Sequence, residues 1–282
     1  MTTRPQPGFL GAGHAAAAVL EGEDFSATDP FIFLMDDRLD LKDSTPRGGP
    51  HPHAGFETVT LVLQGDDKYW KTGSLELMTA GSGIVHTESI VGPTRLHILQ
   101  LWITLPPDKR WTQPRWQELL LEDVPTIKSA TQEIRVYSGT SAGLTSPLQH
   151  HTPFTLVDFR LGANTRFIQE LPASYHGFIY VLVGSVKVGD ITVHAEQTGW
   201  LSDASGELSQ LQLQAGEEAA RFILYAGEPQ GVPIVQHGPF VGDTTDDIAR
   251  LYREYRMGMM RHLNELGEEF KIRYGKVLKA GA

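Results

Sequence analysis

Short apolar runs of strand length recur along the whole chain and are separated by residues that favour turns. Runs of four to eight residues that are rich in β-branched and aromatic side chains, and that end at Gly, Pro or Asp, are typical of β-strands. Many short strands at even spacing favour a sandwich or barrel. The runs cover residues 31–35, 56–63, 74–78, 84–89 and 95–105 in the first half, and 155–161, 178–183 and 221–225 in the second.

Two segments depart from this strand pattern. His14 is followed by four alanines, and alanine is the best intrinsic helix former, but Gly11, Gly13 and Gly22 lie close by, so any helix there would be short. From Thr244 onward apolar residues recur at helical spacing behind a capping residue and two aspartates, which predicts an amphipathic C-terminal helix. Residues 271–282 are mildly basic and are expected to be frayed.

The two halves of the chain resemble each other weakly. Residues 57–65 (ETVTLVLQG) can be aligned without gaps on residues 176–184 (HGFIYVLVG), and residues 121–132 between the halves have little periodicity. We therefore expect an N-terminal domain at 1–128 and a C-terminal domain at 129–282 that ends in the helix. On this register His51 falls on Glu170 and His53 on Pro172, so the metal site described next is expected in the first domain and not in the second.

Two pairs of metal-ligand residues occur in the first half, His51 with His53 and His86 with Glu88. Each pair has i, i+2 spacing, and alternate side chains of a strand leave the same face. If the two strands are neighbours in a small barrel, three imidazoles and one carboxylate converge in its interior. Such a set suits one divalent first-row transition ion and leaves positions for water or substrate.

Several other polar residues have both a structural and a functional interpretation. Glu57 is an even number of residues from His51 and His53, so in a regular strand its side chain lies on their face and can support an imidazole. A bulge at Ala54 and Gly55 would turn it to the other face, where it would form an outward ion pair. Gln100 either binds a ligand in the cavity or is a satisfied core residue. The remaining candidates are interpreted as structural or exposed residues: His97, His150, His151, His176, His194 and His237.

Composition and charge narrow the function further. The chain has 282 residues and no cysteine, which excludes disulfides, thiolate metal sites and cysteine nucleophiles. Its formal net charge of −10 argues against direct binding of nucleic acid over a broad basic face. We find neither an apolar run long enough for a transmembrane helix nor a signal peptide. A cytoplasmic protein that does not associate with membranes is expected.

Four motifs resemble those of the pirin family: HPHAGFETV (51–59), MTAGSGIVHTE (78–88), LQLWITLP (99–106) and GEPQGVPIVQHGPFV (227–241). The resemblance covers almost the whole chain. It implies a bicupin, in which two antiparallel β-barrels of jelly-roll type pack face to face and one metal lies in the N-terminal barrel. It also implies that His51, His53, His86 and Glu88 ligate that metal. The metal is usually iron, and the ligand types also accept Mn, Ni, Co, Cu and Zn.

The resemblance implies two kinds of function. Pirin-like proteins are described as quercetin 2,3-dioxygenases, which predicts an oxidoreductase that cleaves a small aromatic substrate, a flavonol, with O2. In this hypothesis Glu88 is also the catalytic base: it leaves the metal and takes the proton of the flavonol hydroxyl. The alternative is a regulatory protein that binds a transcription factor or a metabolic enzyme in a way that depends on the metal and its oxidation state.

Overall fold

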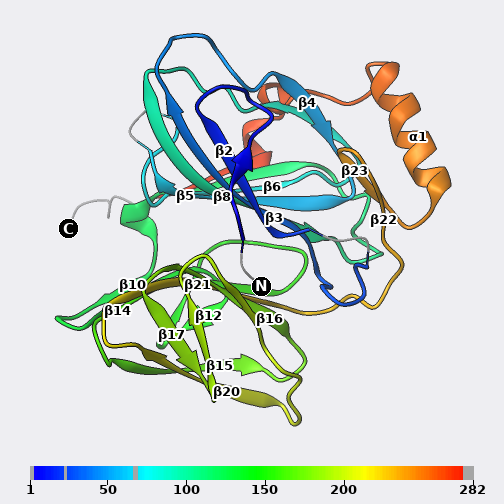
Figure 1. Cartoon of the computed structure of the whole chain (residues 1–282). Coiled ribbons are helices and arrows are strands. Elements are labelled where there is room, and N and C mark those ends of the chain that lie inside the picture. The colour runs from blue at the N-terminus through cyan, green and yellow to red at the C-terminus, as the bar shows by residue number, and fades with distance from the viewer. Residues whose placement is uncertain (1–2, 22–23, 66–68, 276–282) are drawn as a thin grey trace, which may run out of the picture. The chain divides into compact units, whose positions relative to one another are not determined.

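The computed structural model describes residues 3–21, 24–65 and 69–275, which form mainly β-strands (Figure 1). The chain divides into two compact units. The first unit comprises Gln6–Ala16, Ile32–Asp123 and Val232–Ala282, and the second comprises Met1–Pro5, Ala17–Phe31 and Val124–Gly231. The predicted all-β class is confirmed.

The elements of the first unit come from both ends of the chain. The sheet that contains most of its strands has the order β1-β2-β3-β8-β5-β6-β9-β24, in which residues 17–20 of β2 and residue 31 of β3 are counted with the second unit. Strand β4 pairs with β7 in a separate two-stranded sheet. The strands are β1 (Gln6–Pro7), β2 (His14–Leu20), β3 (Phe31–Leu41), β4 (Pro50–His53), β5 (Phe56–Gln64), β6 (Leu75–Thr79), β7 (Ile84–Thr87), β8 (Thr94–Thr104), β9 (Arg115–Leu119), β22 (Val235–His237), β23 (Phe240–Gly242) and β24 (Lys271–Tyr274).

The second unit contains a six-stranded sheet with the order β10-β11-β14-β21-β16-β19 and a four-stranded sheet with the order β15-β20-β17-β18. Apolar side chains from both sheets, among them Val157, Phe159 and Phe222, form one buried core. The strands are β10 (Thr126–Lys128), β11 (Gln132–Ser138), β12 (Thr140–Ser141), β13 (Leu144–Thr145), β14 (Phe154–Leu161), β15 (Arg166–Pro172), β16 (His176–Val183), β17 (Ser185–Val188), β18 (Ile191–His194), β19 (Thr198–Trp200), β20 (Leu208–Ala215) and β21 (Ala220–Gly227).

The weak repeat in the sequence corresponds to a structural repeat. The order β2-β3-β8-β5 in the first unit matches β11-β14-β21-β16 in the second. The β5–β8 pair shifts register between Val62 and Gln64, and the β16–β21 pair shifts between Val181 and Val183, which are the same positions of the ungapped alignment. A bulge locally disrupts the pairing, so its recurrence at one position shows that the two units share their sheet geometry.

The alanine-rich segment, whose local sequence favours a short helix, forms a strand, β2. Four of its apolar side chains are buried, namely Ala16, Ala17, Val19 and Leu20. Strand β2 pairs with β1 on one side and with β3 on the other. This pairing and the burial of the side chains outweigh the helix propensity of alanine, which is a weak preference of less than about 1 kcal/mol per residue.

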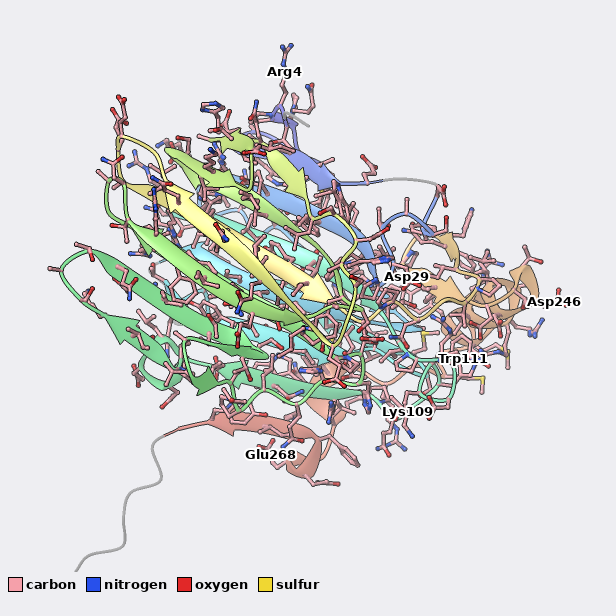
Figure 2. The ribbon with its side chains drawn as sticks, turned by 90° about the horizontal axis from the view of Figure 1, so that it is seen from below. Arg4, Asp29, Lys109, Trp111, Asp246 and Glu268 are labelled. Carbon is pink, nitrogen blue, oxygen red and sulfur yellow. The ribbon has the colours of Figure 1, made fainter. Side chains whose placement is uncertain are left out.

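The predicted C-terminal helix is confirmed as α1 (Thr245–Arg256). Thr244 caps it by accepting from the backbone of Asp247, whose carboxylate accepts from Thr244 in return. The helix ends at Met257, and Gly258 has a φ of +69° that ends the helical path. The buried Ile248 packs in the first unit. Arg250 of the same helix stacks over the ring of Trp111, which is labelled in Figure 2.

The last described strand also belongs to the first unit. Residues Lys271–Tyr274 form β24, which pairs in parallel with β9, so this part of the segment that was expected to be frayed is ordered. Residues 276–282 lie outside the described part of the chain. Although the helix was assigned to the C-terminal domain from the sequence, it and β24 pack with the unit that contains His51.

Candidate metal centre

The three histidines of the predicted site come together on β4 and β7. These strands pair antiparallel, with His51 directly opposite His86 and His53 opposite Ile84. One ring nitrogen of each of His51, His53 and His86 lies within 4.8 Å of the others. The Nε2 atoms of His51 and His86 are 2.8 Å apart. The i, i+2 spacing of His51 and His53 thus brings both rings beside that of His86.

Glu88 lies one residue beyond the end of β7. Its Oε2 is 3.8 Å from Nε2 of His51, and its Oε1 accepts a hydrogen bond of 2.8 Å from the side-chain amide of Gln100 on β8. Gln100 thus fixes one carboxylate oxygen, and the other oxygen is directed to the histidines. The amide of Gln100 is thus satisfied by a group of the candidate site, and binding of a ligand by Gln100 stays a prediction.

Backbone carbonyls orient two of the imidazoles. Nδ1 of His51 lies 2.9 Å from the carbonyl oxygen of Gly49, and Nδ1 of His53 lies 3.4 Å from that of Pro239. A carbonyl only accepts, so in each ring Nδ1 carries the proton and Nε2 of the neutral imidazole keeps its lone pair. Neutral imidazole nitrogens with free lone pairs are the form of histidine that binds metal.

The site is buried on one side and open on the other. His53 and His86 are 5% and 8% exposed, whereas the side chains of His51 and Glu88 are 36% and 24% exposed. Burial and, to a smaller extent, the nearby His51 lower the pKa of His53 to about 3. Burial also lowers the pKa of His86 and raises that of Glu88. The two buried imidazoles therefore stay neutral and available as ligands at neutral pH.

An aromatic wall lies against the buried side of the site. The ring of His53 is 5.3 Å from that of Phe56 and 5.2 Å from that of Trp102, measured between centroids. Trp102 in turn contacts Phe33 on β3 at 5.1 Å. These rings limit the access of water from that side and hold the imidazole in place.

Glu57 does not belong to the site. Gly55 has a φ of +88° and interrupts the strand parity, as the bulge interpretation requires. Glu57 is fully buried on the opposite face of β5, where Oε1 accepts from the hydroxyl of Thr79 at 2.6 Å. His97 likewise lies away from the histidines and contacts Asp36 at 2.7 Å.

The C-terminal segment supports the two ligand strands, and sequence analysis missed this. Val241 donates from its backbone to the carbonyl of Ala54 at 3.0 Å, and Val85 donates to the carbonyl of Arg261 at 2.9 Å. His262 continues this contact, with Nε2 3.0 Å from the hydroxyl of Thr87. The GPFV motif (238–241) could have indicated this contact. Its partners, however, are backbone atoms near His53, which is 186 residues before Pro239, and a pattern of side chains does not reveal backbone contacts.

In the second unit the strand pair that corresponds to β4–β7 is β15–β20. Its inward side chains are not metal ligands. Gln169 and Leu171 on β15 lie opposite Leu211 and Ser209. Leu171 is part of the apolar core, and Gln169 is buried and donates to the carbonyl of Thr140. The ungapped alignment, which put His51 on Glu170 and His53 on Pro172, is wrong by one residue in this strand. The positions that correspond to His51 and His53 are Gln169 and Leu171. Three residues separate β15 from β16, whereas two separate β4 from β5.

The donor set of the first unit fits a divalent transition ion. Three imidazoles and a carboxylate are ligands that Fe, Mn, Co, Ni, Cu and Zn accept, and the partial exposure of His51 and Glu88 leaves an open approach. Two Nε2 lone pairs 2.8 Å apart repel each other unless they share a proton or a cation. Within the described part of the chain, His51, His53 and His86 are the group whose geometry can hold a metal.

The family model described as Pirin matches residues 14–103, and that described as Pirin C-terminal cupin domain matches residues 156–261. Pirin from Rattus norvegicus is 32% identical over 258 residues, which is 87% of each chain. The chain belongs to the pirin family. The second family match includes α1, so this helix follows the C-terminal cupin domain along the chain but packs with the first unit.

Solved structures agree with this assignment and with the predicted bicupin fold. A quercetin 2,3-dioxygenase from Acinetobacter baumannii has a TM-score of 0.80 and 26% identity, and the match covers 92% of this pirin-family chain and 95% of the other. A bacterial pirin from Escherichia coli, solved in complex with nickel(II), has a TM-score of 0.57 and 20% identity over 77% of this chain and 93% of that one, which shows the fold. No helix in the described ranges is long and apolar enough to cross a membrane.

Proposed function

We propose that this protein is an oxidoreductase of the quercetin 2,3-dioxygenase type, which cleaves a flavonol with O2 at one divalent metal ion held by His51, His53, His86 and Glu88. The observation that carries the proposal is the convergence of three imidazole nitrogens within 4.8 Å beside a carboxylate. The similarity to a protein described as quercetin 2,3-dioxygenase supports the substrate class, and the nickel(II) complex of a bacterial pirin supports the metal.

The bound ion would act as a Lewis acid that holds an ionised flavonol hydroxyl and brings the substrate together with O2. His53 and His86 are buried, so they form the fixed part of the ligand set. His51 and Glu88 are partly exposed and face the side from which substrate can arrive. Iron is the first candidate for the ion, and the ligand types leave Mn, Ni, Co, Cu and Zn open.

Glu88 is the proposed base for the flavonol hydroxyl. Gln100 holds its Oε1 by a hydrogen bond of 2.8 Å, so Oε2 is the oxygen that can take a proton. Burial raises the pKa of Glu88, which makes its carboxylate a stronger base than an exposed glutamate. Phe56 and Trp102 exclude water from the side of His53 and so help to keep the reaction away from solvent.

The test is turnover of quercetin by protein that has been stripped of metal and reloaded separately with Fe(II), Mn(II), Co(II), Ni(II) or Cu(II). The proposal predicts O2 uptake with stoichiometric release of CO for at least one metal, and loss of both in folded His53→Ala. Unchanged turnover in that variant would contradict the proposal. So would absence of CO with every metal in loaded, folded protein, and regulation through a protein partner would then be the hypothesis to pursue.

A further inference from the structure

The second unit contains a pocket of about 390 Å³ on the face of its six-stranded sheet. Three cationic side chains line it, Lys128, Arg160 and Arg221, together with one carboxylate, Glu133. The pocket lies at the end of the sheet where Val183 on β16 pairs with Arg221 on β21. Such a local excess of positive charge is unexpected in a chain whose formal net charge is −10.

Two of these cations oppose each other directly. Arg160 on β14 and Arg221 on β21 are partners in the antiparallel register. Like charges in directly opposite positions of a sheet destabilise the pairing. The nearest carboxylate, Asp158, accepts from Arg221 through both oxygens, at 3.1 and 2.9 Å, and is therefore already engaged.

Arg160 lacks a comparable partner. Its Nη2 is 3.8 Å from Asp158, and its buried Nε makes no hydrogen bond within the described residues. Glu133 lies directly opposite Arg160 on β11, but its oxygens pair with Arg135 and, at 3.2 Å, with Lys128. The cluster of Lys128, Arg135, Arg160, Arg221, Glu133 and Asp158 thus holds four cations and two carboxylates. Burial and repulsion by Arg221 and Arg135 lower the pKa of Arg160.

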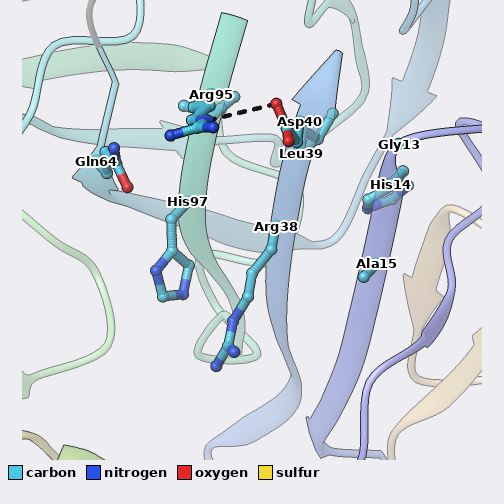
Figure 3. Close-up of a pocket in the computed structure, with 10 residues that line it drawn as sticks. Gly13, His14, Ala15, Arg38, Leu39, Asp40, Gln64, Arg95 and His97 are labelled. Atoms are coloured by element: carbon cyan, nitrogen blue, oxygen red, sulfur yellow. Dashed lines mark hydrogen bonds and ion pairs between the residues drawn. The ribbon is translucent and has the colours of Figure 1, made fainter. Parts of the chain in front are cut away.

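The first unit provides an internal comparison, because it has a pocket at the equivalent place (Figure 3). Asp36 and Arg38 on β3 correspond to Asp158 and Arg160 on β14, and His97 on β8 corresponds to Arg221. Here Arg38 donates to both oxygens of Asp36, at 3.1 and 3.0 Å, and the second arginine is replaced by histidine. The charges of this pocket are therefore matched internally.

We propose that the pocket around Arg160 in the second unit binds a small oxyanion, a phosphate group or a close analogue of one. An anion seated between Arg160, Arg221 and Lys128 would balance the excess charge and give Nε of Arg160 an acceptor. Guanidinium groups bind such tetrahedral anions through two parallel hydrogen bonds. The equivalent pocket of the first unit is not expected to bind one, since Arg38 already makes both bonds to Asp36.

The test is calorimetric titration of the full-length, metal-loaded protein with inorganic phosphate, against NaCl at matched ionic strength. We expect saturable binding of phosphate, weakened at least about tenfold in Arg160→Gln because a charge-assisted hydrogen bond is lost. Arg38→Gln in the equivalent pocket, and Arg166→Gln on the exposed part of β15, should bind as the wild type does. Glycerol phosphate should bind at least as tightly as phosphate if the ligand is a phosphate ester.

Three results would overturn the proposal. Equal heats for phosphate and NaCl would mean that the cluster responds to ionic strength alone. Undiminished binding by Arg160→Gln would place the anion elsewhere. Loss of binding when the metal is removed would place the phosphate on the metal of the first unit. Thermal unfolding provides a check on folding, because Arg160→Gln removes a repulsive pair and should unfold at no lower temperature than wild type in NaCl, while losing the stabilisation by phosphate.

Discussion

His51 and His86 face each other across the β4–β7 pair with their Nε2 atoms 2.8 Å apart. The carbonyl of Gly49 accepts from Nδ1 of His51, so the proton of this neutral ring is on the side away from His86. Two nitrogens held this close need a shared proton or a shared metal ion. The antiparallel register of two short strands thereby sets the spacing of two ligands.

Replacement of His86 by alanine is expected to lower the affinity for a divalent metal at least about a hundredfold. Loss of a hydrogen-bond partner outside the ligand set commonly costs about 10–100-fold, and loss of a ligand should cost more. Metal content after dialysis, measured by mass spectrometry, checks this. His97→Ala is the matched control, because His97 contacts Asp36 rather than the site. Equal metal content in His86→Ala and His97→Ala would contradict the assignment.

Gln100→Leu should weaken metal binding about 10–100-fold without unfolding the protein, since the amide orients Glu88 through its Oε1. Leucine has a similar size but donates no hydrogen bond, so the carboxylate is free to turn away. Competition with a chelator of known affinity measures the change. Gln64→Leu, at the exposed end of β5, serves as the control. An unchanged affinity would mean that Glu88 does not depend on this contact.

Two groups, the buried His53 and the half-buried Glu76, make the stability of the metal-free protein depend on pH in opposite directions. His53 has a pKa of about 3 in place of 6.5, so its contribution is present above about pH 6.5 and is lost as the pH falls towards 3. Glu76 has a pKa raised from 4.5 to about 7, mainly by burial, so its contribution is present below about pH 4.5 and is lost as the pH rises through 7.

The free energy of unfolding of the metal-free protein, measured with urea, should therefore fall less in His53→Gln than in wild type when the pH is lowered from 6.5 to 4.5. The difference should be about 2–3 kcal/mol, since each pH unit between the folded and unfolded pKa contributes about 1.4 kcal/mol. Glu76→Gln should flatten the curve on the alkaline side instead. Parallel curves for wild type and His53→Gln would show that His53 is not kept neutral by burial.

Gly55→Ala should both destabilise the protein and reduce its metal content. Gly55 has a φ of +88°, and an added Cβ would lie 1.9 Å from the carbonyl oxygen of Val241, so the C-terminal segment would have to move away from β4. Gly189→Ala is the control, because its φ of +56° imposes similar backbone strain of about 1 kcal/mol while no atom lies within 4 Å. If both variants retain the metal equally, the segment does not support the site.

Period-two alternation and turn residues predicted the central strands well, because these strands bury one or both faces. The same pattern predicted that Gln100 and Trp102 share a face, and both lie at the site. The alternative for Glu57 could not be decided from the sequence, because one residue with a positive φ, Gly55, changes the parity of everything that follows.

Features that depend on distant backbone could not be predicted. The strand at His14–Leu20 exists because β1 and β3 flank it, which outweighs the local preference of alanine for helix. The carbonyl of Pro239 that orients His53 is 186 residues away in sequence. The connection between β15 and β16 has one residue more than that between β4 and β5, so an ungapped alignment of the two halves places the residues of β15 wrongly by one. The burial of Gln169 and Leu171, rather than sequence similarity, shows that these are the inward side chains.

Electron paramagnetic resonance of the protein loaded with one equivalent of Cu(II) tests most directly whether His51, His53 and His86 hold one metal that a flavonol can reach. The predicted spectrum shows a single site with hyperfine coupling to imidazole nitrogens, which is lost in His53→Ala and changes when quercetin is added. A spectrum that is the same in His53→Ala, or that quercetin leaves unaltered, would contradict the proposed centre.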